Sequence, residues 1–126
     1  YTVPCSESSL PLTFVVAGAG ELAGASLSPE DVIRAGETTV EAMRDKAAHV
    51  IGTMEARLFG LGGAWSGVTC VDIYTAHPIH GFLDRTILER MGSAAVHSVH
   101  WFLSRPPIDA LEFEMDMRGV RQEIRL

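Results

Sequence analysis

The sequence predicts an α+β fold in which two helices cover one face of a mixed β-sheet. Three observations support this prediction. Short β-rich runs alternate with helical segments, the longest helical segment carries a single apolar stripe, and the last strong element alternates apolar and charged residues without exception. One layer of helices buries only one face of a sheet, so we expect the other face to meet solvent or a further subunit.

The first half of the chain predicts one strand, one short helical turn and one long helix. The apolar run at 12–17 predicts a strand that ends at the glycines following it. Ser28 and Pro29 are residue types of an N-cap and a first helical position, which predicts a short turn over 28–35. The principal helix is predicted over about 37–60, where apolar residues recur at three- and four-residue steps. This stripe comprises Val40, Met43, Ala47, Val50, Met54 and Leu58.

The second half predicts a strand, a shorter helix and two further strands. The β-rich run at 68–74 follows the glycines that end the long helix. A helix is predicted over about 80–91, with Gly92 just beyond its end, and a strand over 96–103. The last strand, predicted over 111–118, has one dry face and one acidic face. The acids on that face are Glu112, Glu114 and Asp116.

Length and composition predict one globular domain that spans residues 1–126. The apolar fraction of 47% and the charged fraction of 21% are close to those of ordinary soluble domains, which excludes a disordered or collagen-like chain. The formal charge is −6, and the ten basic residues are scattered singly. Nucleic-acid binding depends on clustered Lys and Arg, so we expect neither a nucleic acid nor an anionic membrane as partner.

Cysteine usage favours a cytoplasmic protein. Cys5 and Cys70 are the two cysteines of a chain large enough to fold without disulfides, and Cys70 is interpreted as a buried structural thiol. No apolar run reaches the roughly 20 residues of a transmembrane helix, and the start of the sequence lacks the basic and apolar regions of a signal peptide. The first residue is Tyr1 rather than Met, so we expect a processed chain or part of a longer one.

The common motifs of nucleotide and metal chemistry are absent or incomplete. Gly18 and Gly20 follow a strand, but a dinucleotide fingerprint needs a third glycine and an immediate helix. Four of the five histidines form two pairs, His77 with His80 and His97 with His100. Residues three apart on a strand face opposite sides, so the second pair is poorly placed to chelate a metal. We therefore predict no metal site and interpret these histidines as surface or hydrogen-bonded groups.

Glu112 is the carboxylate that the pattern singles out. A glutamate on a strand face covered by another subunit is suited to orient water or transfer a proton, particularly where partial burial raises its pKa. The alternative interpretation is an acid on a solvated strand edge. The alternating pattern by itself favours this second interpretation, an acid on a solvated edge.

Several of these segments together resemble the RidA/YjgF family of imine and enamine deaminases. The resemblance covers about residues 12–118: a strand ending in Phe14-Val15-Val16-Ala17-Gly18, a long helix closing on Leu61-Gly62-Gly63, the run at 68–74, a short helix and the terminal Leu111-Glu112-Phe113-Glu114. It implies a chorismate-mutase-like fold, in a homotrimer whose sheets form a central barrel with clefts between subunits. It also implies hydrolysis of a reactive imine or enamine without a cofactor.

The resemblance assigns candidate residues for this chemistry. Glu112 matches the family's water-positioning glutamate, as the catalytic residue, and Gly18 matches the glycine after the first long strand. Counting back from Glu112 places His97 where the family has a carboxylate-binding arginine. Histidine offers one donor and a charge that depends on pH, so capture of a substrate carboxylate is expected to be weaker. Further candidates for substrate binding are Val99, Tyr74 and Arg105, although an extended chain would carry Arg105 far from His97.

Two functional hypotheses follow from this pattern. The first is a trimeric, cofactor-independent deaminase whose specificity is altered by His97 in place of the family's arginine. The second is a non-catalytic trimer that binds a small metabolite in the same clefts. The ribonuclease role of some relatives fits poorly with a net charge of −6. The sequence does not identify the ligand.

Overall fold

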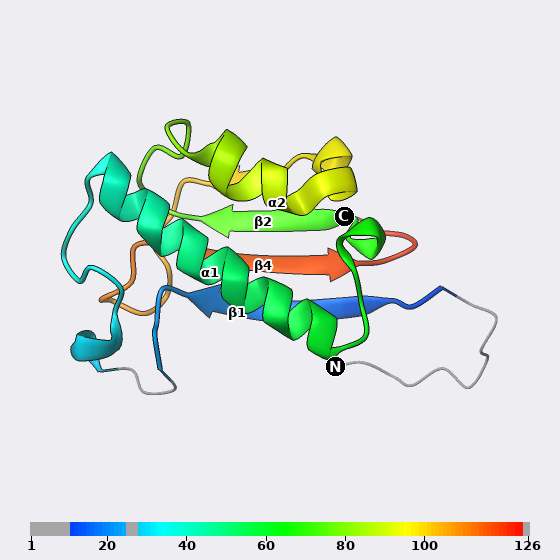
Figure 1. Cartoon of the computed structure of the whole chain (residues 1–126), viewed down its shortest axis with the longest axis horizontal. Helices are drawn as coiled ribbons and strands as arrows, with labels where there is room; N and C mark the ends of the chain where they lie inside the picture. Colours follow the sequence, from blue (N-terminus) through cyan, green and yellow to red (C-terminus); the bar gives the residue numbers. More distant parts are fainter. Residues whose placement is uncertain (1–10, 25–27, 125–126) are drawn as a thin grey trace.

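A computed structural model of the chain describes residues 11–24 and 28–124. Figure 1 shows a long helix that crosses the strands of the sheet. The regular elements are β1 (Phe14–Gly20), α1 (Val40–Gly60), β2 (Cys70–Tyr74), α2 (Glu89–Met91), β3 (His100–Phe102) and β4 (Glu114–Gly119). Turns of 3₁₀-helix lie at Pro29–Asp31, Trp65–Gly67 and Gly92–His97, and a π-helical segment, Leu83–Leu88, leads directly into α2.

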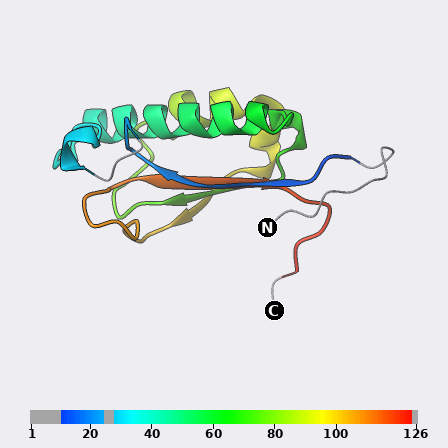
Figure 2. The same cartoon turned by 90° about the horizontal axis from the view of Figure 1, so that it is seen from below.

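The strands form one mixed sheet in the order β1-β4-β2-β3. Strand β4 is antiparallel to both of its neighbours, whereas β2 and β3 run parallel. Seen edge-on, the helices lie on one face of this sheet and the other face is bare (Figure 2). The predicted α+β class, with helices on a single face of a mixed sheet, is therefore confirmed.

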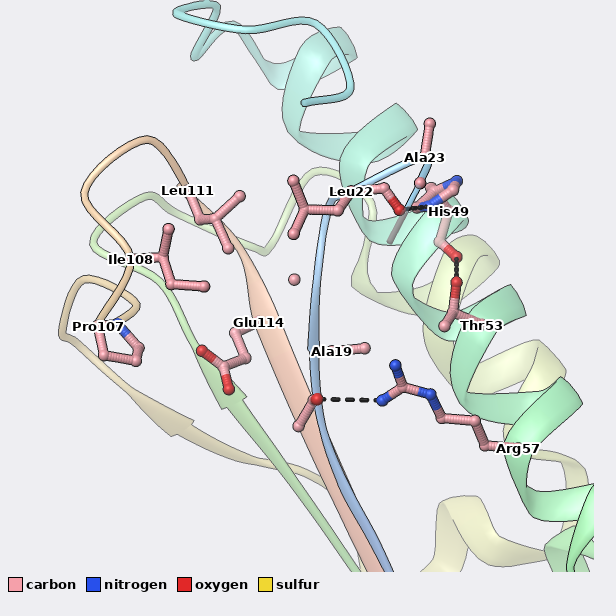
Figure 3. Close-up of a pocket in the computed structure, with 13 residues that line it drawn as sticks. Ala19, Leu22, Ala23, His49, Thr53, Arg57, Pro107, Ile108, Leu111 and Glu114 are labelled. Atoms are coloured by element: carbon pink, nitrogen blue, oxygen red, sulfur yellow. Dashed lines mark hydrogen bonds between the residues drawn. The ribbon is translucent and has the colours of Figure 1, made fainter. Parts of the chain in front are cut away.

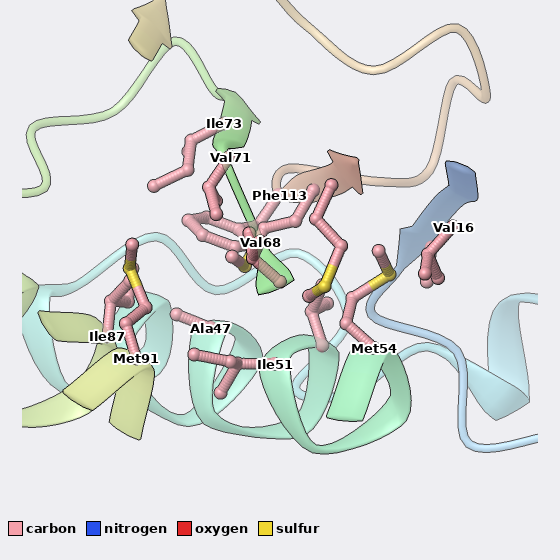
Figure 4. Packing of buried hydrophobic residues seen from close by; sticks show 14 of the residues in the cluster. Val16, Ala47, Ile51, Met54, Val68, Val71, Ile73, Ile87, Met91 and Phe113 are labelled. Carbon is pink, nitrogen blue, oxygen red and sulfur yellow. The ribbon is translucent and has the colours of Figure 1, made fainter. Parts of the chain in front are cut away.

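The core lies between α1 and the sheet. The predicted stripe is buried from Met43 to Leu58, but Val40 is 55% exposed because it is only the first residue of the helix. Figure 4 shows the methionine and branched side chains of both layers interdigitating. Thr39 caps the helix by accepting a hydrogen bond from the Ala42 amide at 3.2 Å. No helix among the described residues is long and apolar enough to cross a bilayer.

A buried ion pair ties the end of β1 to α1 and to the start of β4. Lys46 and Glu21 are both 0% exposed, and the Lys46 Nζ donates to Glu21 Oε1 at 3.1 Å and to the carbonyl of Ile33 at 2.8 Å. The two carboxylate oxygens of Glu21 also accept from the amides of Glu112 at 2.6 Å and Phe113 at 3.0 Å. Glu21 thus joins the residues at the entry of β4 to Lys46 of α1.

This ion pair explains why the last strand is shorter than predicted. The alternation over 111–118 is correct, since Phe113, Met115 and Met117 are buried. The strand nevertheless begins at Glu114, because the two preceding amides donate to Glu21 instead of to a neighbouring strand.

Three other predicted elements differ from the structure in their bounds or type. The predicted strand over 96–103 is a 3₁₀ turn up to His97 followed by a strand of only three residues. Ser98, directly after the turn, has a φ value of 62°, which is incompatible with extended backbone. The predicted helix over 80–91 starts later, with the π-helical segment at Leu83. Strand β1, in turn, extends past its predicted end to Gly20.

Candidate functional site

The candidate site begins at an irregularity in β1. The register of β1 against β4 shifts between Val16 and Ala19, so the backbone there is released from regular pairing. Arg57 of α1 takes up the released carbonyls: its Nη1 donates to the oxygen of Ala17 at 3.1 Å and to that of Gly18 at 3.0 Å. The bulge thus brings a guanidinium to the edge of the sheet.

Glu114 lies against the same bulge from β4. Its partners across the two ladders are Gly20 of β1 and Tyr74 of β2. A Cβ built on Gly18 would overlap Oε1 of Glu114, so the absence of a side chain at Gly18 makes room for this carboxylate. Figure 3 shows Arg57 reaching β1 from the helix while the Glu114 carboxylate points toward the loop that carries Pro107.

Two adjoining pockets share Gly18, Glu114 and Pro107. The larger, of about 470 Å³, extends toward α1 and is also lined by Arg57 and His49. The smaller, of about 230 Å³, extends over the bare face of the sheet. Its remaining lining residues are Tyr74, Arg105 and Asp116. The larger pocket falls within the range of small-molecule sites.

The electrostatic environment of Glu114 favours its protonated form. Burial raises the pKa of this carboxyl, and the nearby carboxylates of Asp116 and Glu21 raise it further. Within residues 11–24 and 28–124 its side chain makes no hydrogen bond, so its oxygens are free for a ligand. A carboxyl whose pKa is raised by burial and by neighbouring carboxylates is a candidate for general acid–base catalysis.

The rest of the smaller pocket is ordered by an aromatic and polar contact. The ring of Tyr74 stacks on Phe102 with centroids 5.1 Å apart, and its hydroxyl donates to Asp116 at 3.0 Å. Burial together with that hydrogen bond raises the pKa of Tyr74 to about 12. Tyr74 is therefore a neutral wall of the pocket at physiological pH.

Glu112 lies beside this pocket in contact with two basic groups. Its carboxylate is 2.9 Å from Nε2 of His77 and 3.5 Å from Nη1 of Arg105. The side chain of Arg105 is 63% exposed. Arg105 can reach Glu112 because the chain turns back after β3. In this turn the backbone amide of Ser104 donates a hydrogen bond to the carbonyl of Phe102 at 2.8 Å. Through this turn Arg105 reaches the smaller pocket.

The structure brings together three of the predicted binding residues and separates two others. Gly18, Tyr74 and Arg105 line one pocket. His97 and Val99 line neither pocket. They precede β3, whose first residue pairs with Asp72 of β2. Glu114 pairs with Tyr74, at the other end of β2. His97 ends a 3₁₀ turn, and Val99 packs against the core. His97 and Val99 are therefore separate from the pockets of their own chain, and their place in a cleft between subunits stays a prediction.

Sequence reasoning missed Arg57 and Glu114 as pocket residues. Arg57 lies near the end of a helix, where a basic side chain ordinarily faces solvent, and only the bulge in β1 gives it a role. Glu114 was recognised as one of three acids on a strand face. The signal that distinguishes it is the small residue beside its carboxylate, Gly18, which no spacing rule connects with it.

Comparison with solved structures identifies the class to which this fold belongs. A candidate endoribonuclease from Thermotoga maritima superposes with a TM-score of 0.51 at 16% identity, over 90% of this chain and 83% of that one. The yeast protein YEO7 superposes with the same TM-score and identity, over 94% and 91% of the two chains. The fold is therefore of the RidA/YjgF type.

Sequence comparison then identifies the particular family. Residues 1–124 match the family described as 2-aminomuconate deaminase CnbZ, and the chain belongs to this RidA-like family. It is 38% identical over 124 residues to 2-amino-5-chloromuconate deaminase of Comamonas testosteroni. The match covers 98% of this chain and 49% of the relative, so the chain spans about half of that relative's length.

Proposed function

We propose that the chain forms a hydrolytic deaminase for an unsaturated amino-dicarboxylate of the 2-aminomuconate class. The observation that carries this proposal is the environment of Glu114, a carboxyl with a raised pKa that lines both pockets while Arg57 lines one and Arg105 the other. Membership of the deaminase family supports the reaction class.

The proposed reaction needs a proton donor and a water molecule. The protonated carboxyl of Glu114 gives its proton to the carbon β to the amino group of the enamine, which leaves a protonated imine (an iminium ion) and the Glu114 carboxylate. The resulting carboxylate then takes a proton from water as the hydroxide adds to the imine carbon. Glu114 returns this proton to the nitrogen of the carbinolamine, and ammonia leaves as the hydroxyl group gives its proton to the Glu114 carboxylate and becomes the ketone. The acid is thereby regenerated, and one water is consumed for each ammonia released. General acid–base catalysis of this kind contributes about 10²- to 10⁴-fold.

The two arginines supply what a dicarboxylate requires. Arg57 uses one Nη1 for two carbonyls and keeps further donors, because a guanidinium carries five N–H bonds. Arg105 is exposed and charged at all physiological pH values. In this proposal the arginines, and not His97, hold the substrate carboxylates. Glu112 positions Arg105 through their 3.5 Å contact, and its direct role in orienting water remains a prediction.

Matched variants test which glutamate transfers the proton. Ammonia release from 2-aminomuconate, and from 2-iminopropanoate generated by an amino-acid oxidase, would be measured for Glu114→Gln and Glu112→Gln. We expect kcat to fall by about 10²-fold or more for Glu114→Gln. For Glu112→Gln we expect mainly a rise in KM. The reverse pattern would return the catalytic role to Glu112.

The same assay separates the enzyme from the alternative of a non-catalytic binding protein. If the wild-type chain accelerates neither reaction while native mass spectrometry detects a bound dicarboxylate, the binding hypothesis replaces the deaminase. If neither turnover nor binding is found, the proposed substrate class is wrong.

We further propose that the bare face of the sheet is covered in a homotrimer. This face carries alternating charged and aromatic side chains from three strands, among them Asp72, Tyr74, Asp116 and Arg118. Covering it would enclose the smaller pocket, which is open toward that side. Light scattering coupled to gel filtration tests the mass. A monomer at micromolar concentration would contradict the assembly but not the pocket chemistry.

A further inference from the structure

A second group of polar side chains lies on the bare face of the sheet, away from the pockets. Cys70 and Asp72 project from β2, and His100 is the first residue of β3, paired with Asp72 in the parallel ladder. The ligand-capable atoms of these three residues all lie within 4.8 Å of one another. Neither the proposed deamination nor the core packing requires this arrangement.

The spacing of the three atoms is close to that of a metal coordination sphere. Cys70 Sγ is 3.3 Å from His100 Nδ1 and 3.4 Å from Asp72 Oδ1, and the last two atoms are 2.9 Å apart. Zinc bonds of about 2.0 Å to nitrogen and oxygen and about 2.3 Å to sulfur, at tetrahedral angles, place ligand atoms roughly 3.3–3.6 Å apart. Each pair would need to separate by only a few tenths of an ångström.

The chemical types of the donors select a class of metal. A thiolate and an imidazole suit zinc and similar transition metals, whereas calcium and magnesium take oxygen ligands. Three protein ligands leave a fourth position open. The ion would have access from solvent, because the side chain of His100 is 45% exposed.

The surrounding charges are compatible with a cation. Arg118 donates to the other oxygen of Asp72 at 2.7 Å, which orients Oδ1 toward the cysteine and histidine. The charge of this guanidinium is opposed by Glu123 at 2.9 Å and by Asp116 at 3.4 Å. Asp116 and Glu123 therefore share the positive charge of Arg118, and Asp72 together with the thiolate that Cys70 forms on binding would balance a divalent ion.

We propose that Cys70, Asp72 and His100 form a binding site for a divalent transition metal of the zinc type, with a water molecule as fourth ligand. Binding replaces the thiol proton by a sulfur–metal bond, and that proton leaves to solvent. The prediction of no metal site rested on two histidines three residues apart, whereas this site uses His100 alone and takes its other ligands from β2.

The test uses cobalt and cadmium, whose bonds to thiolate give charge-transfer bands in the ultraviolet. The titrations are made on the full chain carrying Cys5→Ser, so that Cys70 is the one remaining thiol. We expect a charge-transfer band that saturates at one ion per chain. His100→Ala, at a half-exposed position that tolerates substitution, should weaken binding at least tenfold, and Cys70→Ser should abolish the band.

His97→Ala is the matched control, because it removes an exposed histidine three residues away and should leave the titration unchanged. A band unaffected by His100→Ala would show that the thiol binds metal without the proposed site. The absence of any band at millimolar cobalt would establish that the three groups form only a hydrogen-bonded cluster. Circular dichroism of each variant verifies that it is folded. Neither result depends on deaminase activity.

Discussion

Two clusters of charged residues on the same sheet have opposite relations to solvent. The pair of Glu21 and Lys46 lies beneath α1 with both side chains fully buried. The cluster around Asp72 lies on the bare face, where Arg118 is partly and His100 substantially exposed. Both clusters join segments that are distant in sequence, yet the first has no accessible donor or acceptor to offer and the second does.

The difference separates a structural role from a ligand-binding one. The polar atoms of Glu21 and Lys46 are engaged by a backbone carbonyl, two amides and each other, so the pair fixes where β4 begins. Buried charges need such complete pairing, because an uncompensated one is costly. On the bare face, partial exposure relaxes this demand and leaves room for a partner, a metal or a substrate.

The largest expected effect comes from removing one member of the buried pair. Lys46→Met preserves most of the side-chain volume but leaves the Glu21 carboxylate buried with only amide donors. The free energy of unfolding should fall by about 3–5 kcal/mol, measured by urea denaturation.

Arg34→Met is a suitable control, because Arg34 pairs with Glu37 and Asp45 at the surface. Surface ion pairs contribute little, so this variant should change stability far less. Equal losses in the two variants would contradict the contrast between buried and exposed clusters.

An intermediate effect, on activity instead of stability, is expected from Gly18→Ala. The new Cβ overlaps the Glu114 carboxylate, which is the far end of a flexible side chain and can move aside. Displacement of the catalytic group should lower kcat/KM about 10- to 100-fold with little change in unfolding temperature. Gly60→Ala is the control, since a Cβ there meets nothing within 4 Å. Unchanged kcat/KM in a folded Gly18→Ala variant would remove Glu114 from the reaction.

The sequence predicted the elements of the fold better than their ends. Periodicity identified the buried side of α1 from Met43 onward and the alternation of β4, because burial of one face imposes both patterns. It did not show that Lys46 is buried within the apolar stripe. A lysine in a helix is ordinarily expected to be exposed to solvent. Lys46 is buried because Glu21, distant in the sequence, pairs with it.

The candidate site was harder to predict because its residues meet through irregular backbone. Gly18 and Arg105 were named from a family resemblance, but the bulge in β1 and the turn after β3 decide what they face. Neither feature has a sequence period. Arg57 and Glu114 line one pocket because of that bulge. The positive φ of Ser98 interrupts the strand predicted over 96–103, and His97 precedes this interruption.

The smallest expected effect concerns the charge of Glu114 and has the opposite sign to that at Lys46. Burial, followed by Asp116 and Glu21, raises the pKa of Glu114 in the folded chain above the value near 4.3 of an unfolded one. Below that value Glu114 is protonated in both the folded and the unfolded state, so its ionisation does not lower the free energy of unfolding. As the pH rises, the unfolded state ionises first, and stability is lost until the pH passes the folded pKa.

Glu114→Gln does not ionise, so it should unfold at a higher temperature than the wild-type chain at pH 7. The difference should shrink as the pH falls toward about 4. Thermal unfolding followed by circular dichroism between pH 4 and 7.5 measures it. A difference that is constant with pH would mean that the substitution acts through packing alone. A wild-type chain more stable than the variant at pH 7 would show that the carboxylate has a stabilising partner, and the open face would then resemble the buried pair.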